Sequence, residues 1–190
     1  MYKYVTNVSA ISHYIIKNFC RKFNTAVDAT LGNGHDCDFL SENFNHVYAF
    51  DIQSCAVDSY KSKCRNNVTV INDSHENFKN YIHNEVDCII YNLGFLPGGD
   101  KSIVTRENST IKSLKVALDI LKCGGIICIC AYPGHSEGLK EAKAVTNFVK
   151  DIPKNNYGVL IHSFANRENN PPFLISIEKN YDEVKKCKKN

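Results

Sequence analysis

Short apolar runs alternate with longer segments of helical periodicity along the whole chain. The apolar runs predict strands near residues 25–30, 46–51, 68–72, 86–92, 125–131, 157–164 and 173–178. The helical periodicity predicts helices over residues 8–22, 36–43, 54–65, 75–82, 107–122 and 136–150. The first of these helices is expected to bury one apolar face made of Val8, Ile11, Ile15, Ile16 and Phe19.

This alternation is typical of an α/β fold with a mostly parallel, doubly wound sheet of seven strands and helices on both faces. Only residues 165–172 separate the last two strands, so these strands are expected to pair as a C-terminal antiparallel hairpin. Gly124-Gly125 is expected to end the helix that precedes the fifth strand. Because repeats and linkers are absent, residues 1–190 are expected to form a single domain that ends in a basic tail over residues 181–190.

The most specific motif follows the first predicted strand and reads Val27-Asp28-Ala29-Thr30-Leu31-Gly32-Asn33-Gly34-His35-Asp36. Glycines in such a turn let the backbone approach a nucleoside cofactor, and an acid after the second strand, here Asp51, accepts both ribose hydroxyls. Dinucleotide sites usually have a third small residue where this chain has Cys37. Asp28 or Asp36 would also repel a diphosphate, whereas either suits the cationic S-adenosylmethionine. The motif therefore favours S-adenosylmethionine over a dinucleotide.

Ligands of such sheets bind beyond the carboxyl ends of the strands, where this chain gathers acids, amides and glycines. The residues predicted to bind the cofactor are Asp28, Thr30, Gly32, Asn33, Gly34, Asp36, Asp51, Gln53, Asp73, Ser74 and His75. Asp73 or Ser74 would meet the amino edge of adenine. Asp73 also suits the N-cap of the following helix, which is the alternative for that residue.

The loop after the fourth predicted strand is the second informative segment, Asn92-Leu93-Gly94-Phe95-Leu96-Pro97-Gly98-Gly99-Asp100-Lys101. It is similar to the Asp/Asn-Pro-Pro-Tyr loop of amino-methyltransferases, whose Asn oxygen and a backbone carbonyl accept hydrogen bonds from the target amine. Asn92 and the carbonyl of Leu93 are therefore candidate catalytic groups, and Phe95 is a candidate wall on which a base stacks. The alternative is a glycine-rich turn in which Asn92 is an ordinary cap.

Composition and charge narrow the class of protein. The nine cysteines are scattered without a C-x-x-C pair, and the chain opens with Met1-Tyr2-Lys3-Tyr4 rather than an apolar signal segment. We therefore expect a cytoplasmic protein with reduced cysteines and no metal site. No apolar stretch approaches membrane-spanning length. A net charge of +3 does not by itself indicate nucleic-acid binding, and Lys185-Lys186-Cys187-Lys188-Lys189 fits a solvated tail.

Several motifs together resemble the putative rRNA methylase family. They are residues 27–36, Phe50-Asp51-Ile52-Gln53, Ser74-His75-Glu76, residues 92–101, Tyr132-Pro133-Gly134-His135 and Asn169-Asn170-Pro171-Pro172. The resemblance implies a Rossmann-like class I methyltransferase fold. It also implies methyl transfer from S-adenosylmethionine to the amine of 5-aminomethyl-(2-thio)uridine at the tRNA wobble position, giving 5-methylaminomethyl-(2-thio)uridine. One departure is Asn166-Arg167-Glu168-Asn169, where the family tends to have Asn-Gln-x-Asn.

The implied chemistry requires a neutral amine, because a protonated amine has no lone pair to attack the methyl group. Desolvation and the sulfonium charge both lower the pKa of a bound amine, so a dedicated strong base is not essential. Candidate bases are His75 and His135, with Asp28 or Asp73 as proton acceptors. Of the two histidines, His135 is also predicted to be catalytic. A capping or RNA-contacting role is the alternative for each histidine.

The expected partner is the anticodon stem-loop of tRNA, because an unpaired wobble base can be splayed into a pocket. The residues predicted to bind this substrate are Phe95, Lys101, Arg106 and Arg167. Solvated loop charges are the alternative for the three basic residues. Because no separate RNA-binding domain is visible, a homodimer is an option that would enlarge the RNA-binding surface.

Two other functions stay open at this point. A methyltransferase acting on an exocyclic base amine of rRNA or DNA would use Asn92 in a similar way. A nucleotide-binding module without turnover would retain the fold, although the Asn92 loop beside Asp51 argues against it.

Overall fold

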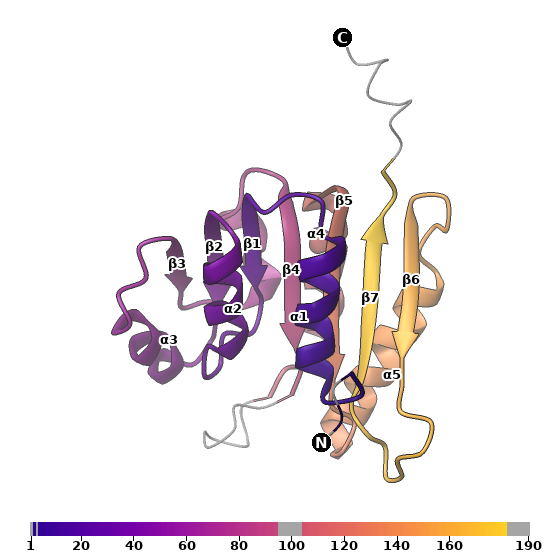
Figure 1. Cartoon of the computed structure of the whole chain (residues 1–190). Helices are drawn as coiled ribbons and strands as arrows, with labels where there is room; N and C mark the ends of the chain where they lie inside the picture. Colours follow the sequence, from indigo (N-terminus) through magenta and orange to yellow (C-terminus); the bar gives the residue numbers. More distant parts are fainter. Residues whose placement is uncertain (1, 3, 95–103, 182–190) are drawn as a thin grey trace.

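One seven-stranded sheet lies at the centre of the structure, a computed structural model that describes residues 2, 4–94 and 104–181 (Figure 1). The strands are β1 (Thr25–Asp28), β2 (His46–Phe50), β3 (Val68–Ile71), β4 (Val86–Asn92), β5 (Leu121–Ala131), β6 (Tyr157–His162) and β7 (Phe173–Lys179). The helices are α1 (Val8–Phe19), α2 (His35–Asn43), α3 (Ser54–Lys61), α4 (Glu107–Ile120), α5 (Ser136–Lys150) and the short 3₁₀ helix η1 (His75–Asn80).

The strand order is β3-β2-β1-β4-β5-β7-β6. Strands β1 to β5 pair in parallel, and β7 pairs antiparallel with both β5 and β6. This topology confirms the mostly parallel sheet with a C-terminal antiparallel hairpin. Because the strand order reverses between β1 and β4, the carboxyl ends of these two strands flank the crevice in which α/β proteins bind ligands.

Helices cover both faces of the sheet, so alternate residues of each strand enter two different cores. Ala26 and Cys88 pack against the face covered by α1 and α2. Their neighbours Val27 and Ile89 pack against the opposite face, which is covered by η1, α4 and α5. In Figure 1, α1 and α2 lie in front of the sheet and α4 and α5 lie behind it.

Helix α1 is shorter than predicted. It ends at Phe19, because Cys20 takes an extended conformation with φ −67° and ψ 126°. Cys20 enters the core, whereas Phe19 is 60% exposed. The expectation that Phe19 lies on the buried face was therefore wrong, because the chain leaves helical geometry directly after it.

The pair Gly124-Gly125 does not end a helix, which corrects the prediction for this segment. Helix α4 stops at Ile120, and both glycines lie inside β5, where its register with β4 shifts. Gly124 has φ +76°, and a Cβ on Gly125 would lie 2.9 Å from the carbonyl oxygens of Asp87 and Lys122. A bulge in the sheet, where backbones approach closely, thus requires small residues here.

No helix among the described residues is long and apolar enough to cross a membrane. The eight cysteines in this part of the chain are free. Within the same residues, no group of three or more His, Cys, Asp or Glu side chains could hold a metal ion. Phe95, Lys101 and residues 182–190 of the expected basic tail lie outside the described residues.

Candidate active site

A pocket of about 330 Å³ lies at the carboxyl ends of β1, β2 and β4. All the predicted catalytic residues line it, as do all the predicted cofactor residues except Asp28: Thr30, Gly32, Asn33, Gly34, Asp36, Asp51, Gln53, Asp73, Ser74, His75, Asn92, Leu93 and His135. Val104, Thr105 and Ser109, which no sequence motif indicates, also line the pocket.

Asp51, directly after β2, holds the glycine turn that follows β1. Its Oδ2 accepts a hydrogen bond from the Gly32 N–H at 2.8 Å, and its Oδ1 accepts one from the Gln53 N–H at 2.8 Å. Each carboxylate oxygen keeps another lone pair, which is available to a ribose hydroxyl. At Gly34, φ is +80° and an added Cβ would clash with the buried ring of Tyr60, so both backbone and packing require glycine.

Asp28 lies beneath the turn rather than in the pocket wall. Its side chain is fully buried, its Oδ1 accepts a hydrogen bond from the Thr30 N–H at 3.0 Å, and its Oδ2 has no hydrogen-bond partner among the described residues. Burial, together with the negative charge of Asp36, raises the pKa of Asp28 well above its usual value. Asp28 thus supports the turn from the protein side, where the geometry gives it no direct contact with the pocket.

The start of η1 forms another wall of the pocket. Ser74, and not Asp73, is the N-cap of this helix, and its hydroxyl accepts a hydrogen bond from the Glu76 N–H at 3.4 Å. Asp73 instead accepts hydrogen bonds from the side chains of Asn77 and Tyr81 at 2.8 and 2.9 Å. Burial raises the pKa of Asp73, but these bonds and one from the Ser74 amide outweigh burial, and the pKa is lowered. Asp73 is therefore an ionised acceptor at the pocket wall.

His75 is a buried, uncharged imidazole. It is 7% exposed, and its ring meets the ring of Tyr91 edge-on with the centroids 5.7 Å apart. Its Nδ1 has no hydrogen-bond partner among the described residues. Desolvation lowers the pKa of His75 to about 4, which the charge of Glu76 opposes only weakly. At neutral pH this imidazole is a weak base.

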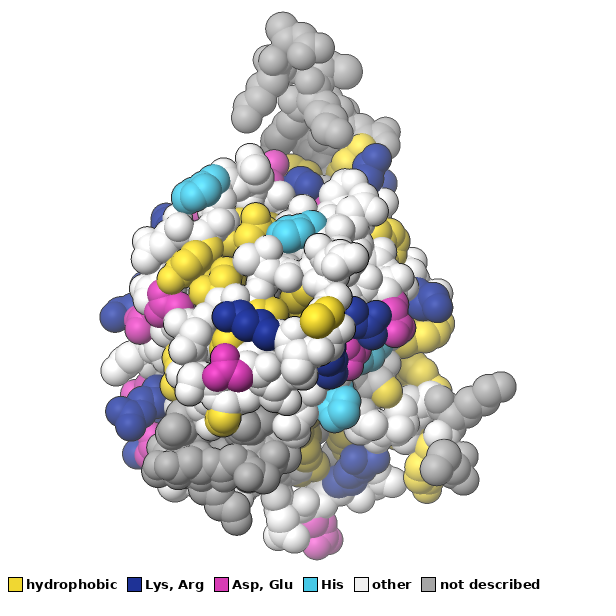
Figure 2. All heavy atoms as spheres, turned by 90° about the vertical axis from the view of Figure 1, so that its left-hand side faces the viewer, with side chains coloured by type: hydrophobic (Ala, Val, Ile, Leu, Met, Phe, Trp, Pro, Cys, Tyr) yellow, Lys and Arg dark blue, Asp and Glu magenta, His cyan; other side chains and the backbone are white. Residues whose placement is uncertain are grey.

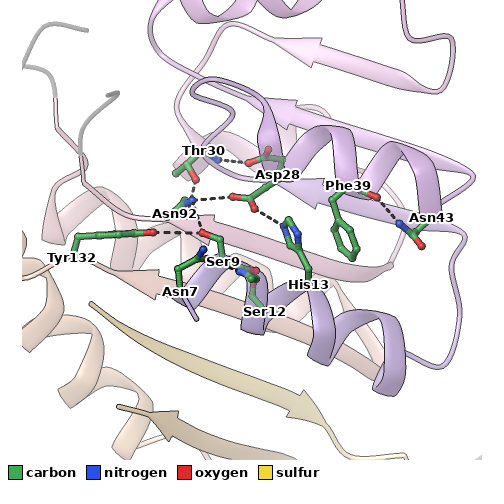
Figure 3. Close-up of polar contacts among 12 residues, drawn as sticks. Asn7, Ser9, Ser12, His13, Asp28, Thr30, Phe39, Asn43, Asn92 and Tyr132 are labelled. Atoms are coloured by element: carbon green, nitrogen blue, oxygen red, sulfur yellow. Dashed lines mark hydrogen bonds and ion pairs between the residues drawn. The ribbon is translucent and has the colours of Figure 1, made fainter. Parts of the chain in front are cut away.

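Asn92 is the last residue of β4, and its side chain reaches across to α2. Its N–H donates to Thr30 Oγ1 at 2.7 Å, and its side-chain Nδ2 donates to Asp36 Oδ2 at 2.9 Å. Figure 3 shows Asn92, Thr30 and Tyr132 gathered where the end of β4 meets the start of α1. Because Asp36 occupies the amide nitrogen, the amide oxygen Oδ1 is the group that can accept a hydrogen bond from a ligand. Leu93 follows and is nearly buried at 3% exposure.

Asp36, in the first turn of α2, connects Asn92 to a histidine that no sequence signal indicates. Its Oδ1 accepts a hydrogen bond from His13 Nε2 of α1 at 2.6 Å, and Asp36 is only 5% exposed. The His13 ring stacks on Phe39 with the centroids 3.9 Å apart and the planes inclined by 5°. His13 and Phe39 face each other between the two helices in Figure 3. In sequence, His13 is one polar residue among the apolar positions of α1, and only the packing of α1 on α2 brings it to Asp36.

His135 has the capping role that was the alternative to catalysis. It is the N-cap of α5, and its Nδ1 accepts a hydrogen bond from the Gly138 N–H at 3.0 Å. The neutral imidazole in this geometry carries its proton on Nε2. His135 therefore lines the pocket as a hydrogen-bond donor, which suits contact with a substrate oxygen better than proton abstraction.

The two basic residues predicted to bind substrate that the structure describes lie outside the pocket lining. Arg106 is exposed and precedes α4. Arg167 lies in the loop between β6 and β7, with its guanidinium carbon 3.5 Å from the centroid of the Phe164 ring. It also donates a hydrogen bond to the carbonyl of Thr6 at 3.1 Å.

A buried glutamate that the sequence did not indicate supports the chain on both sides of residues 95–103. The Gly94 N–H donates to Thr105 Oγ1 at 2.7 Å, and the Thr105 hydroxyl donates to Glu141 Oε2 at 2.6 Å. The Thr110 hydroxyl donates to Oε1 of the same glutamate at 2.6 Å. Glu141 is 1% exposed, and burial raises its pKa. In sequence it resembles any surface charge of a helix, so no local signal could have revealed it.

Residues 47–178 match the family described as "Putative rRNA methylase". The chain belongs to this family. It is also similar to the chloroplastic tRNA (mnm(5)s(2)U34)-methyltransferase of Arabidopsis thaliana, with 30% identity over 187 residues that cover 89% of this chain and 68% of the relative.

Two solved structures extend the similarity. A putative rRNA-methylase from Clostridium thermocellum is 38% identical with a TM-score of 0.88, over 92% of this chain and 98% of that one. A putative methyltransferase from Streptococcus mutans, solved in complex with SAH, is 35% identical with a TM-score of 0.85, over 92% of this chain and 99% of that one. These similarities confirm the Rossmann-like methyltransferase fold expected from the sequence motifs.

Membership in the rRNA methylase family makes the chain a methyltransferase by descent as well as by fold. Asp51, Ser74 and Asn92 lie inside the residues that match the family, whereas the glycine motif of residues 27–36 precedes them. The geometry joins the two regions, because Asp51 and Asn92 both hydrogen-bond to that turn.

The buried His75 predicts how the stability of this methyltransferase responds to acid. Its pKa is about 4 in the folded state, and in the unfolded state it returns to about 6.5. Between these values the unfolded chain binds a proton that the folded chain does not, so the free energy of unfolding falls as the pH drops from about 6.5 to 4. The expected loss is about 3 kcal/mol in total.

Urea denaturation of His75→Leu across this pH range is expected to show a shallower fall in unfolding free energy than the wild type. The exposed His83→Leu serves as the control and should keep the wild-type slope. Equal slopes for wild type and His75→Leu would contradict a neutral, buried His75.

Proposed function

We propose that the chain transfers a methyl group from S-adenosylmethionine to the amine of 5-aminomethyl-(2-thio)uridine at the wobble position of tRNA. The product is 5-methylaminomethyl-(2-thio)uridine. The observation that carries this proposal is the Asn92 amide, held by Asp36 in the pocket with its oxygen left as an acceptor. The cytoplasmic location and the RNA partner expected from the sequence belong to the same proposal, as does the homodimer that the sequence left as an option.

The pocket fits S-adenosylmethionine in both shape and charge. The turn at Gly34 has no room for a side chain, and Asp51 keeps lone pairs for ribose hydroxyls. Asp36, Asp51 and Asp73 all line the pocket, and such a set of carboxylates favours a cation and disfavours the diphosphate of a dinucleotide. The similar Streptococcus mutans structure is in complex with SAH. When bound, S-adenosylmethionine supplies a methyl group activated by a sulfonium.

The residues around Asn92 suit an amine acceptor. The amide oxygen of Asn92 can accept an N–H of a neutral amine and so direct the nitrogen lone pair away from itself, toward the incoming methyl group. Leu93, whose backbone carbonyl is the other predicted acceptor, also lines the pocket and is nearly buried. The Arabidopsis relative, named for mnm(5)s(2)U34 of tRNA, supports an aminomethyl-uridine rather than another amine.

Exposed aromatic side chains beside α1 suit single-stranded RNA. Tyr4 and Tyr14 are 64% and 54% exposed, and their rings meet edge-to-face with the centroids 6.4 Å apart. Arg167 stacks on Phe164 and bonds to Thr6, just before α1 begins. Unpaired bases stack on aromatic rings and on guanidinium planes, so this group provides contacts for the nucleotides that flank the wobble base.

The opposite edge of the molecule, around β3 and α3, is less suited to RNA. Figure 2 shows basic and acidic side chains interspersed over this face. Lys63 pairs with Asp38 at 2.7 Å, and Arg65 lies 3.6 Å from Asp38 and 3.7 Å from Glu42. These pairings reduce the positive potential available to phosphates, and we therefore assign RNA binding to the side of α1 and Arg167.

The proposed reaction predicts a specific product. Purified protein and S-adenosylmethionine are mixed with bulk tRNA from a strain that lacks this methylation, and the nucleosides are analysed by mass spectrometry. We expect the 5-aminomethyl-uridine species to convert to their methylaminomethyl forms. Conversion of amines in rRNA or DNA but not in tRNA would instead support the second function left open by the sequence. SAH binding without transfer to any nucleic acid would support a module without turnover.

Substitutions of Asp51 and Asn92 are expected to separate cofactor binding from methyl transfer. Asp51→Ala should weaken SAH binding about tenfold or more, because it removes the acceptor for the ribose hydroxyls and for the Gly32 N–H. Asn92→Ala should leave SAH affinity near wild type and lower the single-turnover transfer rate about 100-fold. Calorimetry measures the first quantity and quenched transfer assays the second. An equal loss of binding and transfer in Asn92→Ala would remove Asn92 from the catalytic role.

Tyr14 and Arg167, which belong to the stacking residues beside α1, are expected to affect RNA affinity alone. Tyr14→Ala and Arg167→Ala should each raise the KM for tRNA about tenfold, because each removes a stacking contact. Phe19→Ala is the matched control, since Phe19 is a similarly exposed aromatic residue on the same helix. SAH affinity should not change in any of these variants. An unchanged KM in both Tyr14→Ala and Arg167→Ala would place the RNA elsewhere.

A further inference from the structure

The proposed function assigns two acceptors to the amine, the amide oxygen of Asn92 and the backbone carbonyl of Leu93, and the inference that follows rests on that function. A side-chain amide can be oriented by its own hydrogen bonds, as Asp36 orients Asn92. A backbone carbonyl takes its direction from the whole peptide to which it belongs. For Leu93, the contacts of that peptide lead to a buried glutamate for which the methyl transfer has so far no use.

The peptide between Leu93 and Gly94 is held by one side chain. The Gly94 N–H donates to Thr105 Oγ1 at 2.7 Å, and the Gly94 carbonyl accepts a hydrogen bond from the Thr105 N–H at 2.9 Å. In a planar trans peptide, the N–H and the carbonyl of the preceding residue point in opposite directions. The Leu93 carbonyl oxygen therefore points away from Thr105. Gly94 has φ +135°, a conformation that glycine adopts readily, so the chain can turn directly after this peptide.

Glu141 determines which way the Thr105 hydroxyl donates. A hydroxyl has one hydrogen, and two oxygens lie within its reach: Glu141 Oε2 at 2.6 Å and the Gly94 carbonyl oxygen at 3.4 Å. The shorter contact takes the hydrogen, which leaves a lone pair of Oγ1 for the Gly94 N–H. The other glutamate oxygen accepts a hydrogen bond from the Thr110 hydroxyl at 2.6 Å. Glu141 is thus held through both oxygens and fixes the orientation of Thr105.

The two faces of the sheet show where the Leu93 carbonyl is directed. Glu141 belongs to α5, which packs on one face, whereas the side chain of Asn92 bonds to Asp36 of α2, on the opposite face. Because the Gly94 N–H is directed toward the α5 side, the Leu93 carbonyl is directed toward the side of the Asn92 amide. Both residues line the pocket. The two predicted acceptors therefore serve the same region of it.

We propose that Glu141 is a positioning residue for the methyl transfer and acts through Thr105 on the carbonyl of Leu93. This carbonyl accepts one N–H of the neutral amine, and the amide oxygen of Asn92 accepts the other. Two bonds together fix the nitrogen and leave its lone pair facing the methyl group. Without the link to Glu141, the peptide can rotate and one of the two bonds is lost.

Stability alone does not account for a carboxylate at this place. Glu141 is 1% exposed, and burial raises its pKa although the hydrogen bonds from Thr105 and Thr110 oppose that rise. An apolar side chain would pack between the helices without the cost of burying a carboxylate. It could not, however, accept the hydrogen of the Thr105 hydroxyl. What the carboxylate adds to the packing is the fixed direction of that hydroxyl.

Removal of the Thr105 hydroxyl tests the link. Thr105→Val keeps the shape of the side chain and removes the acceptor of the Gly94 N–H. We expect the single-turnover transfer rate to fall about 30-fold. The SAH affinity should stay within about twofold of the wild type, because this hydroxyl bonds to Glu141 and Gly94. Thr105→Ser restores the hydroxyl and should recover the rate to within about threefold of the wild type.

Thr110→Val is the matched control. It removes a hydroxyl that donates to the same glutamate from α4 and lies outside the pocket lining. Both valine variants should lose stability in urea, but the transfer rate of Thr110→Val should stay within about threefold of the wild type. Equal losses of rate in the two valine variants would show a purely structural role and overturn the proposal.

Substitutions of Glu141 test the link from its other end. The amide oxygen of Glu141→Gln can still accept the Thr105 hydroxyl, so this variant should keep a rate within about threefold of the wild type. Glu141→Leu has no acceptor and should lose about as much rate as Thr105→Val, again with little change in SAH affinity. A rate of Glu141→Leu equal to that of Glu141→Gln would overturn the proposal.

Amide hydrogen exchange in the SAH complex separates this inference from the proposed function. In Thr105→Val the Gly94 amide should exchange at least about tenfold faster than in the wild type. The Leu93 amide, which donates to the Cys130 carbonyl at 2.9 Å, should keep its exchange rate. An unchanged Gly94 exchange rate would overturn the positioning role alone, because this measurement needs no RNA. Failure of the wild type to methylate tRNA would overturn the wobble function alone.

Discussion

Three hydrogen bonds at the end of β1 hold the site together. The Thr30 and Gly32 amides donate to the carboxylates of Asp28 and Asp51, and the Asn92 amide donates to the Thr30 hydroxyl. The Gly32 and Asn92 bonds join the segment after β1 to β2 and β4, whereas the Thr30 bond holds that segment against the end of β1 itself. Backbone N–H groups that leave a buried sheet must find acceptors, and here the acceptors come from the residues that also form the pocket. The fold and the ligand site therefore depend on the same contacts.

The second feature of the site is a nearly buried carboxylate at the meeting point of three elements. A charge with the low exposure of Asp36 is costly unless it is hydrogen-bonded, and its partners come from α1 and β4. Helix α1 is thus more than a cover for the sheet, because it contributes His13 directly to this contact. The requirement to satisfy Asp36 places an imidazole and an amide within one hydrogen bond of the same group.

The side of the pocket to which we assign RNA binding differs in character from its interior. The interior is acidic and suits a cationic cofactor and an ammonium, whereas the side near α1 offers Tyr4, Tyr14 and Arg167. A polyanion would be repelled by the interior, but a single nucleoside carrying an amine would not. Under the proposed function, this contrast would let one small domain bind a phosphate chain on its surface and a positively charged amine inside. It also accords with the relatives, which include a tRNA methyltransferase and a methyltransferase solved with SAH.

The sequence by itself determined the sheet, its C-terminal hairpin and most of the pocket lining, because these depend on local signals. Strand periodicity, the glycine turn and the acids that follow strands can each be recognised in the sequence. Because the carboxyl ends of parallel strands meet at one edge of a sheet, these signals also predict where the pocket lies. It did not reveal the bulge at Gly124-Gly125, since a glycine pair suits a helix end and a sheet irregularity equally well. Only the tertiary structure decided the roles of His13 and Glu141, and it gave His135 a cap and Asp28 a buried position. The contacts of His13 and Glu141 and the burial of Asp28 depend on residues far apart in the chain, and such contacts leave no periodic or local trace in the sequence. The His135 cap is a local contact with Gly138, and the sequence had left capping open as the alternative to catalysis.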